Sequence, residues 1–68
     1  MNEEVFNLSV RRFLKTFGVA AQREIEKAVD QAIRDGTIAG TETLRARARL
    51  EIERLPTQCT IESDITLE

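Results

Sequence analysis

The sequence contains no histidine, tyrosine or tryptophan, and it has one cysteine, one proline and three glycines among 68 residues. Histidine is the usual general base and the commonest metal ligand, so its absence argues against an enzyme and against a metal centre. A single cysteine cannot form an intrachain disulfide, which fits a reducing cytoplasm. Long apolar runs are also absent, so we expect neither a membrane-spanning segment nor a signal peptide.

The reactive side chains that are present have structural interpretations. The strand pattern turns Cys59 inward, where a thiol packs in a core and has no histidine to activate it. Glu3 and Glu4 suit the start of a helix, because carboxylates there complement the helix dipole. Glu62 and Asp64 face arginines of a neighbouring strand. The sequence therefore predicts a non-enzyme with no catalytic, cofactor-binding or metal-binding residues, and no cofactor.

The composition is that of a small soluble domain. Charged residues make up 32% of the chain and hydrophobic residues 41%, which is a globular balance. A chain of 68 residues has room for one domain with a thin core, so we expect residues 1–68 to form a single unit. The net charge is −2, which disfavours a nucleic-acid partner.

Two amphipathic segments in the first half of the chain predict two helices. The first is expected over about Glu3–Phe17, with Asn2 as its N-cap and Gly18 ending it in a left-handed conformation. The second is expected over about Ala21–Asp35, with Gly36 as its stop. Their apolar faces consist of Phe6, Val10, Phe13, Leu14 and Phe17, and then of Ile25, Ala28, Val29, Ala32 and Ile33.

The stretch Glu42–Leu67 predicts one β-hairpin closed by a loop at Arg54–Thr57. Apolar residues occupy every second position of Leu44–Ile52 and most of Cys59–Leu67, so one face is apolar and the other is charged. The expected fold is α+β: two N-terminal α-helices packed on one face of a C-terminal antiparallel β-hairpin. The expected core is formed by Phe6, Val10, Phe13, Phe17, Ile25, Val29, Ile33, Leu50, Ile61 and Ile65.

Charges on the polar face of the hairpin predict its register. Pairing Arg49 with Glu62 also pairs Arg47 with Asp64, so that unlike charges lie opposite each other. A slip by one residue would turn the apolar residues to the other face, which is less favourable. We therefore expect Arg49 opposite Glu62.

The first strand also suggests a way to self-associate. It is basic in its first half and acidic in its second, so antiparallel pairing with a second copy would oppose unlike charges. The expected function is a non-enzymatic protein-interaction module whose partner is another protein or itself, in a possible homodimer. The candidate self-association strand carries Arg45, Arg47, Arg49, Glu51 and Glu53.

A winged helix-turn-helix DNA-binding module is the alternative. The segment Phe17–Ile25 resembles the turn and second helix of that motif, with the hairpin as the wing. Gln22, Arg23 and Lys27 would then face the DNA. Acidic residues on the same helix oppose this alternative, because contacts to phosphates dominate affinity for DNA.

Finally, the chain combines a start at Asn2–Phe6, the segment Gln22–Val29 preceded by Gly18 and Val19, and the positions Gly36, Gly40 and Leu44 before an alternating tail. This pattern resembles a family of short bacterial proteins known as a domain of unknown function. The resemblance implies a bacterial, cytoplasmic protein and carries no activity. Ala20 and Ala21 depart from the family pattern, which has Ser or Thr before the Gln-Arg-Glu segment, and leave the start of the second helix open.

Overall fold

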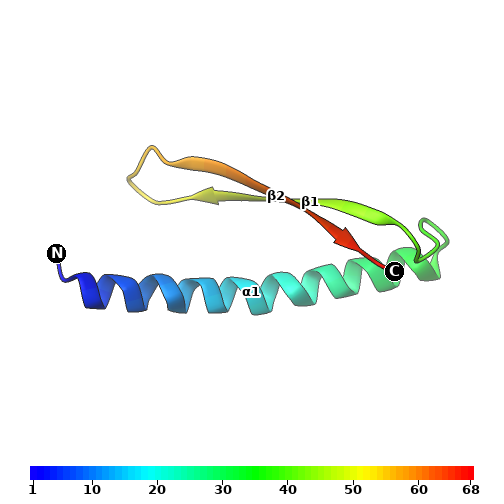
Figure 1. Cartoon of the computed structure of the whole chain (residues 1–68), viewed down its shortest axis with the longest axis horizontal. Coiled ribbons are helices and arrows are strands. Elements are labelled where there is room, and N and C mark those ends of the chain that lie inside the picture. Colours follow the sequence, from blue (N-terminus) through cyan, green and yellow to red (C-terminus); the bar gives the residue numbers. More distant parts are fainter. The chain divides into compact units, whose positions relative to one another are not determined.

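The computed structural model describes residues 1–68 and contains one helix and two strands (Figure 1). These are α1 (Glu3–Arg34), β1 (Thr43–Glu51) and β2 (Gln58–Thr66). The chain separates into two units, Met1–Asp35 and Gly36–Glu68. The α+β class is confirmed, but the prediction of two helices is wrong, because one helix of 32 residues takes their place.

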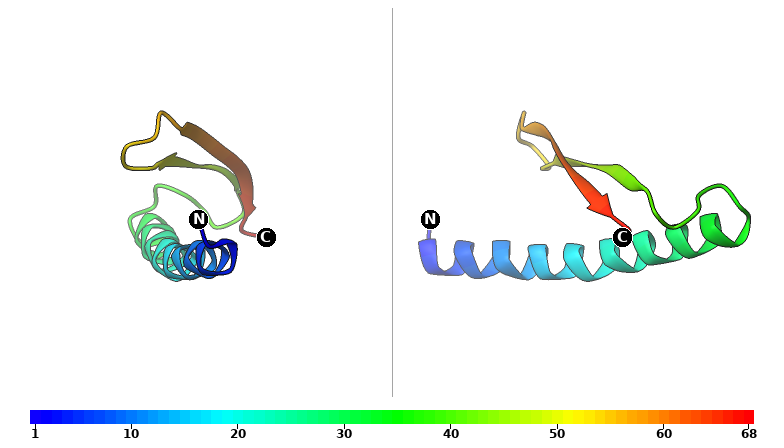
Figure 2. Two further views of the ribbon diagram at one scale, coloured as in Figure 1. Left: turned by 90° about the vertical axis from the view of Figure 1, so that its left-hand side faces the viewer. Right: turned by 45° about the vertical axis from the view of Figure 1, so that its right-hand side comes forward.

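Gly18 lies inside α1 and does not end it, and the helix runs past it without a break (Figure 2). A glycine in a helix interior costs only about 1 kcal/mol relative to alanine. The residues that follow, Ala20–Glu24, are all strong helix formers. Positions 18–21 also offer no Ser, Thr, Asp or Asn to cap a new helix. Continuing the helix therefore costs less free energy than stopping and restarting it.

The two ends of α1 follow the sequence prediction. The side chain of Asn2 caps the start, where its Oδ1 accepts hydrogen bonds from the backbone N–H of Glu4 at 3.1 Å and of Val5 at 3.2 Å. Gly36 has a φ of 81°, the left-handed conformation expected of a glycine that follows a helix. Local signals were sufficient at both ends.

The hairpin is antiparallel, and its register differs by two residues from the predicted one. Glu62 lies opposite Arg47, and Asp64 lies opposite Arg45. A shift by two keeps each side chain on its own face, so the alternation of apolar residues does not detect it. In the predicted register Arg45 would oppose Thr66, whereas the observed register gives it an acidic neighbour.

The loop Ile52–Thr57 joins the strands and is longer than the predicted four residues. Its backbone turns through Arg54, whose φ is 69°, and the N–H of Leu55 donates to the carbonyl of Ile52 at 3.1 Å. Pro56 lies in this loop as predicted, where its missing N–H leaves the strand ladder intact.

No residue of the chain is buried, so the prediction of a ten-residue core is wrong. Within its own unit, a single helix or a two-stranded ribbon has no second layer against which to bury a side chain. The alternation predicted for β1 is present, since Leu44, Ala46, Ala48 and Leu50 are half-buried and their neighbours exposed. Cys59 is exposed, contrary to its predicted inward position.

Candidate interaction surface

The apolar residues of α1 continue across Gly18 in an eleven-residue repeat. Eleven residues complete slightly more than three helical turns, so residues spaced in this way line up along one side of the helix. The repeat extends over about 40 Å of helix. We call its members the α1 stripe: Phe6, Val10, Leu14, Phe17, Ala21, Ile25, Ala28 and Ala32.

Aromatic side chains in the first half of α1 are open to solvent. Phe6 is 51% exposed, Phe13 beside the stripe 53% and Phe17 46%. The rings of Phe13 and Phe17 stack with their centroids 6.4 Å apart and their planes at 14°. Fully burying a side chain of this size yields about 1.5–3 kcal/mol. These exposed apolar side chains make α1 the candidate interaction surface of the chain.

The polar side of α1 contains few internal contacts. Its one ion pair joins Lys27 Nζ to Glu24 Oε1 at 3.9 Å, and both side chains are highly exposed. Arg11, Arg12 and Lys15 form no ion pair within the chain. The unit Met1–Asp35 has six basic and six acidic residues and is therefore neutral.

The candidate DNA-facing residues all lie on this one helix. Gln22, Arg23 and Lys27 follow Gly18 without an intervening turn. A helix-turn-helix requires a second helix set at an angle to the first, and that arrangement is absent here. The winged helix-turn-helix alternative depended on a turn between two helices, and the prediction of that turn is wrong.

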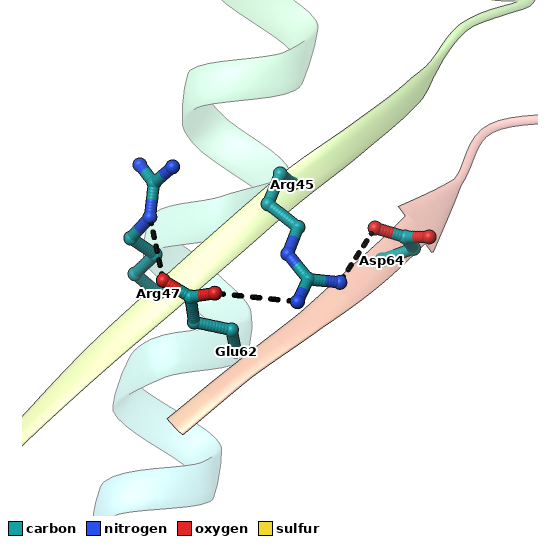
Figure 3. Close-up of polar contacts among 4 residues, drawn as sticks. All are labelled: Arg45, Arg47, Glu62 and Asp64. Carbon is teal, nitrogen blue, oxygen red and sulfur yellow. Dashed lines mark hydrogen bonds and ion pairs between the residues drawn. The ribbon is translucent and has the colours of Figure 1, made fainter. Parts of the chain in front are cut away.

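The charged face of the hairpin is connected by hydrogen-bonded ion pairs (Figure 3). Arg45 reaches two acids, with Nη1 donating to Asp64 Oδ1 at 3.0 Å and Nη2 to Glu62 Oε2 at 3.2 Å. Arg47 Nε donates to the other oxygen of Glu62 at 2.8 Å. We call these four residues the charge ladder. Exposed pairs contribute only about 0.2–1 kcal/mol each, but unlike charges placed opposite each other favour one register.

The other residues of the candidate self-association strand are also engaged inside the hairpin. Arg49 Nε lies 3.2 Å from Glu51 Oε1, and Arg49 Nη2 donates to Gln58 Oε1 at 2.9 Å. Glu53 lies beyond Glu51, the last residue of β1. The arginines of the candidate self-association strand therefore all have contacts within the hairpin.

A carboxylate that the sequence analysis did not identify organises the loop before β1. Glu42 accepts hydrogen bonds from the backbone N–H of Ala39 at 2.7 Å, of Gly40 at 2.8 Å and of Thr41 at 3.1 Å. The N–H groups of Ala39 and then Gly40 hold the pKa of this carboxyl below its ordinary value. The carbonyl of Glu42 also accepts from Leu67 N–H at 3.1 Å. The only indication of this role in the sequence is that an acidic residue directly follows a loop that contains glycine.

No group of three or more histidine, cysteine, aspartate or glutamate side chains is arranged to hold a metal ion. No helix of the chain is both long and apolar enough to cross a membrane.

Comparison with known proteins identifies a family but no characterised relative. No curated protein and no solved structure matches the chain. One family model matches residues 1–68, and its description is a family of unknown function, DUF6494. The predicted resemblance to a domain of unknown function is thereby confirmed over the whole chain. The protein belongs to the DUF6494 family.

Proposed function

We propose that this protein is a non-enzymatic protein-interaction module that binds its partner through the α1 stripe. The observation that carries the proposal is the stripe itself, an apolar surface along one side of α1 in a chain where no side chain is buried. Burial of exposed apolar surface by a partner is favourable in free energy. The exposed phenylalanines are suited to anchor such a partner, because aromatic side chains are enriched at interfaces.

The side chains that could perform chemistry support a binding role. The acids and arginines of the charge ladder neutralise one another on an exposed face. Cys59 is exposed and has no histidine anywhere in the chain to activate its thiol. A single free thiol also suits the bacterial cytoplasm, which we include in the proposal as the setting implied by the sequence resemblance.

Self-association through β1 is the less favoured route for an interaction module. Its arginines already contact acids or an amide within the hairpin, so a second copy would have to compete with these contacts. On α1, by contrast, Arg11, Arg12 and Lys15 are without ion-pair partners on the same helix as the exposed phenylalanines. The helix therefore offers more free energy to a partner than the strand does.

Two leucines of α1 provide a matched test. Leu14 belongs to the stripe and is 55% exposed, whereas Leu8 lies off the stripe and is 58% exposed. Leu14→Glu and Leu8→Glu change charge and helix propensity equally, so they differ mainly in the face that they alter. Proteins captured from an extract by the immobilised wild type would be identified, purified and rebound to all three chains.

We expect the purified partner to bind Leu8→Glu like the wild type and to bind Leu14→Glu at least about tenfold more weakly, since a charge would enter an apolar interface. Equal affinity for the two variants would contradict the proposal. A gel-shift assay with random duplex DNA at low salt gives the DNA alternative its own measurement. A shift that is lost on Arg23→Glu would favour DNA binding.

A further inference from the structure

We infer that the partner covering the α1 stripe is the α1 stripe of a second copy, with the two helices antiparallel. This inference rests on the proposed function, because it names the occupant of the surface proposed there. Three properties of α1 support it: the sizes of the stripe residues, the length of the stripe and the distribution of charge.

Side-chain size changes from one end of the stripe to the other. Phenylalanine, valine and leucine fill its first half, whereas alanine provides most of its second half. An antiparallel pair centred near position 19 sets three of the five large residues against alanines: Phe6 against Ala32, Val10 against Ala28, and Phe17 against Ala21. The other two, Leu14 and Ile25, lie opposite each other at intermediate positions.

A parallel pair would lose this complementarity. Phe6 and Phe17 would meet their own copies, and the alanines of the second half would face alanines. The first half of such an interface would be overpacked and the second half would contain voids, and both defects destabilise packing. Antiparallel helices also place the positive end of each helix dipole beside the negative end of the other.

The length of the stripe fits a second helix. The stripe extends over about 40 Å, whereas a strand of nine residues such as β1 extends over about 30 Å. A second α1 has the same length and the same eleven-residue repeat. Matching repeats allow the two stripes to stay in contact along their whole length through a right-handed supercoil.

The charges of α1 permit this pairing. The helical unit is neutral, so two copies do not repel each other strongly. In the antiparallel arrangement Arg11 lies near Glu26 of the second copy, and neither has an ion-pair partner within its own chain. Glu3 would lie near Asp35 of the second copy, but both are exposed at the helix ends, where salt screens the repulsion.

The first experiment measures mass. Light scattering and sedimentation of the full chain from micromolar to near-millimolar concentration should show two chains for the wild type and for Leu8→Glu. Leu14→Glu should weaken the association at least about 30-fold, the change expected when a buried anchor is lost. Circular dichroism of each variant at high concentration establishes whether its helix is still formed.

A charge exchange keeps the inference testable if Leu14→Glu unfolds the chain. Arg11→Glu should weaken dimerisation about two- to fivefold at low salt, which is the range for an exposed ion pair. Adding Glu26→Arg to the same chain should restore the wild-type affinity, because the opposite charges are then exchanged. Failure of the second change to rescue the first would count against the antiparallel arrangement.

The second experiment determines the orientation of the helices. In a Cys59→Ser background, a spin label attached at Arg34→Cys should lie about 45 Å from its copy along the axis of an antiparallel pair. In a parallel pair the same labels would lie within about 20 Å. A label at Val19→Cys, near the centre, should give a short distance in either orientation and serves as the control.

Several results would overturn the inference. These are a wild type that stays monomeric near millimolar concentration, a dimer that is insensitive to Leu14→Glu although folded, and a short distance between labels at Arg34→Cys. Leu14-dependent binding to phosphatidylglycerol vesicles by a chain that does not self-associate would also overturn it. A monomer that binds another purified protein through Leu14 overturns this inference and leaves the proposed function standing. A folded Leu14→Glu variant that retains every binding activity contradicts both.

Discussion

The charged residues of the hairpin form more and shorter ion pairs with one another than those of the helix do. On the hairpin, Arg45 and Arg47 contact Glu62 and Asp64 at 2.8–3.2 Å across the two strands. On α1, the one ion pair is a 3.9 Å contact within a single turn. The polar face of the hairpin is therefore largely satisfied by its own residues, whereas that of the helix contains a single longer ion pair.

The apolar residues of the two regions differ less. Leu44, Ala46, Ala48 and Leu50 of β1 are half-buried, while the three phenylalanines of α1 are about as exposed as Ile61 of the hairpin. The roles proposed for the two regions therefore differ: the charge ladder holds the register of the hairpin, and the α1 stripe binds a partner. The following predictions test this difference, beginning with the largest expected effect.

Phe17→Ala should cost about 2–4 kcal/mol of association free energy, because it removes a central aromatic group of the stripe. Val19→Ala is the control, since Val19 is on the same helix but off the stripe, and it should cost less than about 0.5 kcal/mol. Thermal unfolding followed by circular dichroism at several protein concentrations measures both. If Phe17→Ala and Val19→Ala had the same stability at every concentration, the α1 stripe would not be an association surface.

Glu62→Gln should destabilise the hairpin by about 1 kcal/mol, since Glu62 is the acid shared by two arginines of the charge ladder. Glu53→Gln removes the same charge in the loop, where no ion pair is present, and should have little effect. Melting of the β1 and β2 amide signals in NMR spectra reports the difference. High salt should reduce the effect of Glu62→Gln, because the pairs are exposed.

Gly18→Ala should stabilise α1 by about 0.5–1 kcal/mol. A methyl group at this position would meet nothing within 4 Å, and Gly18 is not among the glycines with positive φ. If residue 18 instead formed a left-handed turn between two helices, the same change would be destabilising. The melting temperature of the helical signal distinguishes the two outcomes.

The smallest expected effect concerns the loop held by Glu42. Because the folded-state pKa of its carboxyl is lowered from 4.5, its contribution to stability is present above pH 4.5 and is lost as the pH falls through the lowered value. The amide signals of Ala39 and Gly40 should therefore titrate below pH 4.5. Glu42→Gln should abolish that titration, and an unchanged titration curve would show that another acid is responsible.

Much of the secondary structure could be predicted because its determinants are local. Asn2 caps the helix through the two backbone N–H groups that follow it, and Gly36 ends it through its own backbone conformation. Gly18 was misinterpreted because glycine is compatible both with a helix end and, at modest cost, with a helix interior. The missing cap at positions 18–21 and the repeat that continues past Gly18 were the signals for one helix.

The candidate site was predicted less well. Four residues of the α1 stripe were assigned to a core, since periodicity identifies a face and not what covers it: Phe6, Val10, Phe17 and Ile25. The hairpin register was missed because a two-residue shift leaves the faces unchanged, and only the contacts of Arg45 with Asp64 and Glu62 distinguish the two arrangements. Both errors concern contacts between segments, which local sequence does not specify.

Within each element, the contacts join residues that are close in the sequence, and this has a consequence for the folding kinetics. β1 and β2 are joined by a short loop, and α1 forms through contacts within each turn. Helices of this kind form within about 1 μs and hairpins within about 10 μs. After dilution from denaturant, these elements should therefore appear in a fast phase whose rate is independent of protein concentration. Pairing of two copies requires diffusion, so any later phase should become faster as the protein is made more concentrated.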